Sequence, residues 1–152
     1  MDTNSATNDT PAAYEFQRAF LFSFKVRQDY PGNLAGAFRE FTQEPDITAH
    51  WEKLGETIVA DMLTTAARLA YEARIRGGGG NVDVFPDEIR DPGTYGPLVD
   101  IAHTLIHTMK NDGETVTAAE CVRLVADLNM RDVVAVFAAL VMTLFPPRGA
   151  AS

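Results

Sequence analysis

The chain has 152 residues, of which 46% are hydrophobic and 22% charged, and it carries a formal net charge of −8. This length suits one domain, which can bury a core without help from disulfides or metals. The negative charge argues against a large phosphate-facing surface, so we do not expect nucleic acid as a partner. The single cysteine, Cys121, excludes an intramolecular disulfide framework and is typical of a reducing compartment.

The two ends of the chain are expected to be disordered. Residues 1–9 are polar and show no hydrophobic periodicity, and residues 148–152 follow two prolines. The first residues lack the basic and apolar regions of a secretory signal peptide, and no later stretch is long enough for a transmembrane helix. We therefore expect a cytoplasmic protein without a membrane partner, in which residues 10–147 form one helical domain.

The segment from residue 14 to 28 allows two interpretations. Thr10-Pro11 before it is typical of a helix start, because proline is favoured at the first helical position. Apolar side chains at every second position between 19 and 27 are also typical of a strand. In both cases four phenylalanines within nine positions predict a large surface that is buried or covered by a partner. The candidate interface residues are Phe20, Phe22 and Phe24.

A turn and a short helix follow, and the helix ends before Pro45 because proline disfavours a helical conformation in the preceding residue. A long amphipathic helix is then expected from Asp46 or Thr48 to about Arg76. Its apolar stripe, at spacings of three and four, consists of Trp51, Leu54, Ile58, Met62, Thr65 and Leu69. The opposite, solvent-facing side consists of His50, Lys53, Thr57, Asp61, Thr64 and Arg68.

The glycines at 77–80 end this helix and begin a flexible loop at 77–97. Consecutive glycines do not make a rigid element, because each one loses much backbone freedom on ordering. The glycines also lack the Lys-Ser/Thr pair of a phosphate-binding loop and follow a helix rather than a strand, so we expect no nucleotide there. Four acidic residues in the loop would steer a basic partner: Asp83, Asp87, Glu88 and Asp91.

Three further helices are expected after the loop. The first is amphipathic, runs from about Pro97 to Asn111 and is closed by Gly113. The second begins at a capping box formed by Thr117 and Glu120, in which each side chain bonds the free N–H of the other residue. A short break near residue 129 then leads into the third helix.

This last helix contains VVAVFAALVMTLF from Val133 to Phe145, in which Thr143 is the one polar residue. A helix that is apolar on every side must be surrounded by protein or by lipid. Thirteen residues reach only about 20 Å, which is short of the roughly 30 Å core of a bilayer. The sequence therefore predicts an all-α fold: a single-domain bundle of four or five helices around the apolar C-terminal helix. The residues expected to pack against that helix are Trp51, Leu54, Ile58, Leu105 and Leu128.

The strongest candidate for a chemically active site is a metal site formed by Asp100, His103 and His107. Their spacing places them on one face of one helix, where two imidazoles at i and i+4 can share a metal and the carboxylate can be a third ligand. This face lies opposite the apolar stripe, where solvated residues belong. Thr104 also stands where a zinc-protease helix has its glutamate. Cys121 lies on the apolar side of its helix, where cysteines are mostly inert.

The sequence thus indicates a small, acidic, non-enzymatic module for protein–protein interaction that self-associates. Such a module would be an adaptor, a regulator, an assembly factor or an immunity-type protein. The reason is the excess of apolar surface in a short chain, and the expected partner is another protein or a second copy of this one. The alternative is a metal-binding protein or enzyme that uses Asp100, His103 and His107. No cofactor is expected in the first interpretation.

Overall fold

The computed structural model describes residues 11–30, 34–73 and 96–144, and these residues form helices and no strand. The predicted all-α class is confirmed, but the described residues contain seven helices rather than four or five. The helices are α2 (Pro11–Asp29), α3 (Leu34–Thr42), α4 (Pro45–Leu54), α5 (Glu56–Tyr71), α6 (Gly96–Asp112), α7 (Glu114–Asp127) and α8 (Met130–Met142). The two predicted tails lie outside the described residues, and so does the predicted loop except for Gly96 and Pro97, which begin α6.

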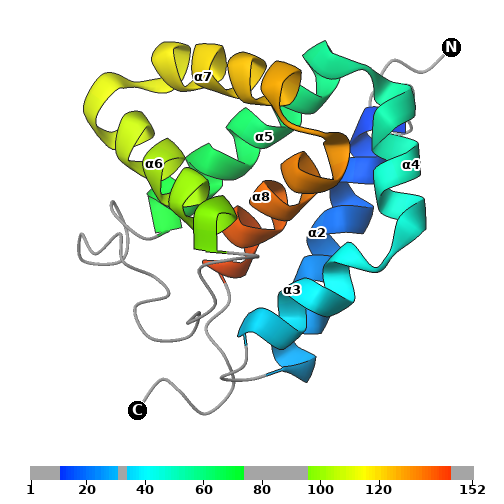
Figure 1. Cartoon of the computed structure of the whole chain (residues 1–152). Coiled ribbons are helices and arrows are strands. Elements are labelled where there is room, and N and C mark those ends of the chain that lie inside the picture. The colour runs from blue at the N-terminus through cyan, green and yellow to red at the C-terminus, as the bar shows by residue number, and fades with distance from the viewer. Residues whose placement is uncertain (1–10, 31–33, 74–95, 145–152) are drawn as a thin grey trace, which may run out of the picture.

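The apolar helix α8 lies between two groups of helices. Figure 1 shows α2, α3 and α4 on one side of it and α5, α6 and α7 on the other. It contacts each of the other described helices, and every residue from Val133 to Met142 is buried. Neighbours on all sides explain why this helix needs no polar face.

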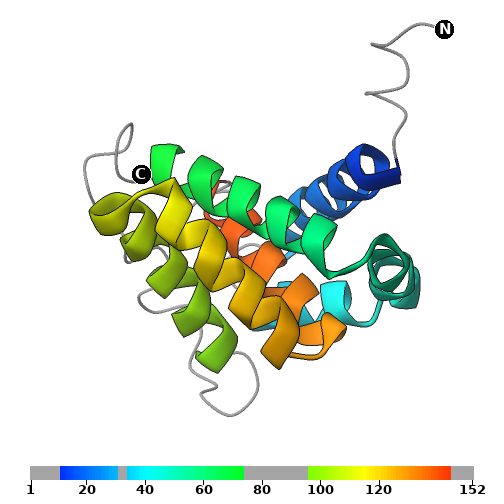
Figure 2. The same cartoon turned by 90° about the horizontal axis from the view of Figure 1, so that it is seen from above.

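Aromatic rings join α2, α4 and α8 at Phe137. The ring of Trp51 from α4 lies 4.9 Å from the Phe137 ring, with an angle of 73° between the planes. The ring of Phe16 from α2 lies 5.2 Å from it, at 83°. Both are edge-to-face pairs, in which the positive edge of one ring meets the negative face of the other. This junction fixes the position of α2 at the edge of the molecule, where it lies beside the start of α5 (Figure 2).

The alternative of a strand between residues 19 and 27 is wrong, because α2 is helical from Pro11 to Asp29. Its buried positions follow a helical rather than an alternating pattern, with Ala19, Ser23 and Val26 facing the core. The hydroxyl of Ser23 donates to the carbonyl oxygen of Ala19 at 2.8 Å, so its burial leaves no unpaired donor. The helix begins at Pro11, as the start signal predicts.

The long helix predicted from residue 46 to 76 is two helices, α4 and α5, with Gly55 between them. Gly55 has φ +94° and ψ 157°, a conformation that L side chains rarely adopt. The break changes the direction of the second half of the predicted helix, which is α5. As a result Ile58 is exposed and Thr64 is buried, whereas the sequence predicted the reverse for both residues. The hydroxyl of Thr64 is satisfied by the carbonyl oxygen of Ala60 at 2.8 Å.

Two predicted helix starts also need correction. The side chain of Glu44, rather than Asp46 or Thr48, accepts from a backbone N–H at the start of α4. The capping box is wrong because α7 already begins after Gly113. Thr117 therefore lies inside the helix, where its hydroxyl donates to the Gly113 carbonyl oxygen at 2.8 Å.

Candidate functional site

The outward face of α2 bears three large apolar side chains that remain exposed: Tyr14 at 61%, Leu21 at 56% and Phe24 at 40%. The opposite side of the same helix is anchored in the core through Ala19, Ser23 and Val26. An exposed apolar side chain is common by itself, but three large ones on one face of a single helix are less so, and exposed apolar surface that gathers on one face is typical of interaction sites. This patch is the main candidate for a functional surface.

The patch follows a heptad-like spacing. We call five positions the α2 stripe: Tyr14, Gln17, Leu21, Phe24 and Gln28. Their spacings alternate between three and four, which places them along one face of the helix, as at the a and d positions of a coiled coil. Gln17 is exposed and Gln28 half-buried, and none of the five residues is charged. A second helix is therefore the element that fits this stripe by spacing.

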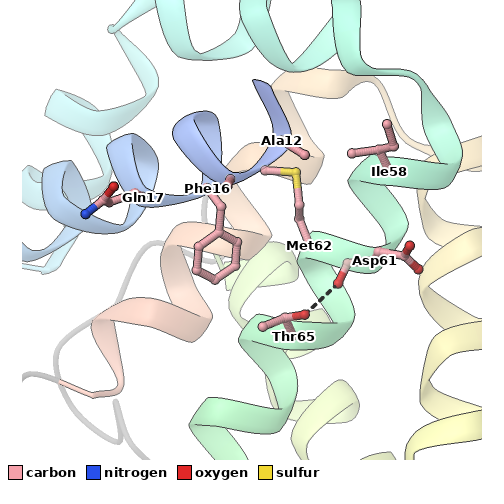
Figure 3. Close-up of a pocket in the computed structure, with 8 residues that line it drawn as sticks. Ala12, Phe16, Gln17, Ile58, Asp61, Met62 and Thr65 are labelled. Atoms are coloured by element: carbon pink, nitrogen blue, oxygen red, sulfur yellow. Dashed lines mark hydrogen bonds between the residues drawn. The ribbon is translucent and has the colours of Figure 1, made fainter. Parts of the chain in front are cut away.

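A groove of about 740 Å³ opens between α2 and α5, beside the stripe (Figure 3). Met62 extends from α5 toward Ala12 at the start of α2, and the Phe16 ring lies below them (Figure 3). Asp61 is the one charged residue among the described residues that line the groove. The lining residues are Ala12, Ala13, Phe16 and Gln17 from α2, and Ile58, Asp61, Met62 and Thr65 from α5.

On its other side, α2 is tied to α4 by a polar cluster. The Nδ1 atom of His50 lies 3.1 Å from a carboxylate oxygen of the buried Glu15 and 2.8 Å from the guanidinium of Arg18. Arg18 also lies 3.7 Å from the exposed carboxylate of Asp46. Each charged group therefore has an opposite charge or a ring nitrogen beside it. The cluster orients α2 relative to α4 and so positions the stripe toward solvent.

The three phenylalanines predicted as an interface do not share a face. Phe24 is exposed in the stripe, whereas Phe20 and Phe22 are half-buried and pack against the core. Phe22 lies 5.5 Å from the ring of Phe41 in α3, and Phe20 lies 6.2 Å from the ring of Phe16. Residues two apart diverge on a helix, so a grouping made with period two mixes core and surface positions. The interface remains a prediction, and the structure offers Tyr14 and Leu21 beside Phe24 to carry it.

The three predicted metal ligands lie on α6, where Asp100 and His107 are exposed and His103 is half-buried. Within residues 11–30, 34–73 and 96–144, no group of three or more His, Cys, Asp or Glu side chains is arranged to hold a metal ion. His50, the remaining candidate ligand of this type, is engaged with Glu15 on α2. The metal site therefore stays a prediction that gains no support from this arrangement.

Cys121 is fully buried in α7. Burial raises the pKa of its thiol to about 11, against which a hydrogen bond with Thr64 has a smaller effect. The thiolate is the nucleophilic form of cysteine, so a thiol that keeps its proton at neutral pH is not a candidate nucleophile.

Sequence reasoning missed the groove and the Glu15–His50 contact, because both join segments that lie far apart in the chain. The stripe left a signal that could have been found: once the segment is taken as a helix, positions 14, 17, 21, 24 and 28 are all uncharged.

Comparisons with protein-family models, with curated proteins and with solved structures give no match for this chain. No helix in the described part of the chain is long and apolar enough to cross a membrane. The α2 stripe and the groove beside it are therefore the features of this chain that bear on its function.

Proposed function

We propose that this protein is a non-enzymatic module for protein–protein interaction, and that the α2 stripe and the adjoining groove are its binding surface. The observation that supports this most is the row of exposed apolar residues Tyr14, Leu21 and Phe24 on one helix. Apolar patches of this kind on a folded domain are typical of binding sites. The module would act in the cytoplasm as an adaptor, regulator, assembly factor or immunity-type protein.

The surface is held by the core, which favours binding. Phe16 packs on Phe137, and the Glu15–His50 contact joins α2 to α4. A surface that already has its bound shape loses less conformational entropy when a partner docks. The expected binding mode is therefore a helix of the partner that lies along α2, with apolar side chains at spacings of three and four.

A photo-crosslinking experiment tests this function. The photoreactive residue p-benzoylphenylalanine replaces the exposed Gln17 in the full chain, which is then irradiated in an extract of the cells that contain the protein. We expect a discrete crosslinked product, identified by mass spectrometry, because Gln17 belongs to both the stripe and the groove.

The same photoreactive residue at Val122 is the matched control, because Val122 lies on α7 and is 57% exposed. A second variant combines the probe at Gln17 with Leu21→Glu, which should remove the product by placing a carboxylate in the apolar patch. Equal crosslinking from both probe positions, or a product that survives Leu21→Glu, would contradict the proposed surface.

A further inference from the structure

We propose that the occupant of the α2 stripe is the same stripe of a second copy, so that the protein forms a weak, reversible twofold dimer through α2. This inference rests on the proposed function, because it uses the same surface and names the partner. In a twofold interface the same patch serves both copies, so the patch must be complementary to itself.

The first support is the pattern of the stripe. In an antiparallel pair of helices, a positions of one helix meet d positions of the other. This places Tyr14 opposite Phe24 of the partner, and Gln17 opposite Leu21 of the partner. Aromatic rings then meet aromatic rings at both ends of the contact, and Gln17 meets Leu21 of the partner near its centre. No charged side chain of the stripe would be buried, so the patch does not repel its own copy.

The second support is the distribution of charge. The helix α2 has three basic residues (Arg18, Lys25 and Arg27) and two acidic ones (Glu15 and Asp29), so its net charge is +1. The whole chain has a net charge of −8, which leaves −9 for everything outside α2. Because Arg27 is buried, the remaining charged residues of α2 (Arg18 and Lys25 against Glu15 and Asp29) sum to zero, so two copies that meet along α2 bring together less negative charge than the chain carries on average.

The cations beside the stripe are also paired within their own copy. Lys25 lies 2.9 Å from Asp29, and Arg18 lies near Glu15 and Asp46. Two copies can thus approach along α2 without bringing unneutralised cations together.

The third support is the area available, which also sets the expected affinity. A covered aromatic side chain buries about 150–250 Å², so the exposed fractions of Tyr14 and Phe24 amount to roughly 200 Å² per copy. With Leu21, Gln17 and Ala13 included, the two copies together bury on the order of 1,000 Å². This is the lower end of specific interfaces, where association is weak and depends on concentration. The expected dissociation constant is therefore micromolar or weaker.

Sedimentation velocity of the full chain tests the dimer. Between about 5 and 500 μM the average mass of the wild type should rise from one copy toward two, as for a micromolar dissociation constant. Leu21→Glu places two carboxylates close to the twofold axis and should weaken association at least about tenfold. Val122→Glu is the control, because Val122 is exposed to the same degree as Leu21, 57% against 56%, and gains the same charge.

A wild type that stays monomeric throughout this range would overturn the dimer, and so would equal association of wild type and Leu21→Glu. Loss of association in Val122→Glu as well would also overturn it, because general charge repulsion rather than α2 would then be the cause. A crosslinked partner of different sequence at Gln17, found together with a monomeric wild type, would leave the proposed function standing and assign the surface to another protein.

Disulfide trapping gives an independent test of the antiparallel geometry. The native Cys121 is buried and keeps its proton, so introduced thiols react in its place. A mixture of Gln17→Cys and Leu21→Cys proteins should form mixed disulfides faster than either protein forms disulfides with itself. Trapping no faster than that of Val122→Cys would contradict this arrangement.

Discussion

At the scale of single residues, the thiol of Cys121 makes the stability of the protein vary with pH in the alkaline range. Burial raises its pKa from 9.0 to about 11, so the unfolded chain releases this proton at lower pH than the folded protein does. The contribution of the thiol to stability is therefore complete below about pH 9 and is lost as the pH rises toward 11. A difference of about two units between the pKa of the thiol in the folded and the unfolded state corresponds to roughly 2–3 kcal/mol of unfolding free energy.

Urea titrations at several pH values measure this effect. Other groups also titrate in the alkaline range, so the useful quantity is the difference in unfolding free energy between the wild type and Cys121→Ala. We expect this difference to shrink by about 2 kcal/mol between pH 8.5 and 11, because alanine has no proton to lose. Parallel curves for the two proteins over the whole range would contradict the buried, protonated thiol.

At the scale of helices, Gly55 determines where α4 ends and α5 begins. Its φ of +94° is unfavourable for other residues, and a Cβ atom added there meets no atom within 4 Å. Gly55→Ala therefore tests backbone strain without a steric clash, and it should lower the unfolding free energy by about 1–3 kcal/mol in urea denaturation. Glu56→Ala, at the neighbouring exposed position, is the control and should change stability by less than about 0.5 kcal/mol. Equal stability of Gly55→Ala and wild type would mean that residue 55 adopts another conformation.

The same glycine shows what could be predicted for the helices and what could not. The pattern of apolar residues located α6 and α8 well, because each has one consistent periodicity and a clear end, such as Gly113 after α6. The helix break at Gly55 could not be predicted, because a glycine inside a helical pattern costs only about 1 kcal/mol and does not by itself end a helix. Packing of α4 and α5 in different directions decides the break, and that is a property of the whole fold.

The candidate surface was predicted in kind but not in detail. The sequence indicated an apolar excess near residues 14–28, and α2 does carry exposed apolar side chains. The sequence did not show which side of the helix faces the core, and both Phe20 and Phe22 pack against it. The groove could not be predicted at all, since Phe16 and Met62 are brought together only by the packing of α2 beside α5.

At the scale of the whole molecule, α8 contacts both groups of helices, so we expect the two groups to unfold as one cooperative unit. It contacts α2, α3 and α4 on one side and α5, α6 and α7 on the other. A change in its centre therefore acts on both groups at once. The indole of Trp51, the single tryptophan of the chain, reports on the first group through its contact with Phe137, whereas far-UV circular dichroism reports on all helices.

Leu140→Asp tests this arrangement. Leu140 is completely buried in α8, so the substitution removes a large apolar side chain and places a carboxylate where water cannot reach it. The substitution should lower the unfolding free energy by more than about 4 kcal/mol, which is a large share of the roughly 5–15 kcal/mol of a typical domain. We expect loss of the native Trp51 fluorescence together with loss of helical circular dichroism, because neither group keeps its core without α8.

The volume-conserving variant Leu140→Met is the control, and it should cost less than about 1.5 kcal/mol while both probes still report one coincident transition. If Leu140→Asp lost the circular dichroism of some helices but kept the native Trp51 signal, the two groups would be separate folding units. A soluble Leu140→Asp protein as stable as the wild type would contradict the burial of α8 itself.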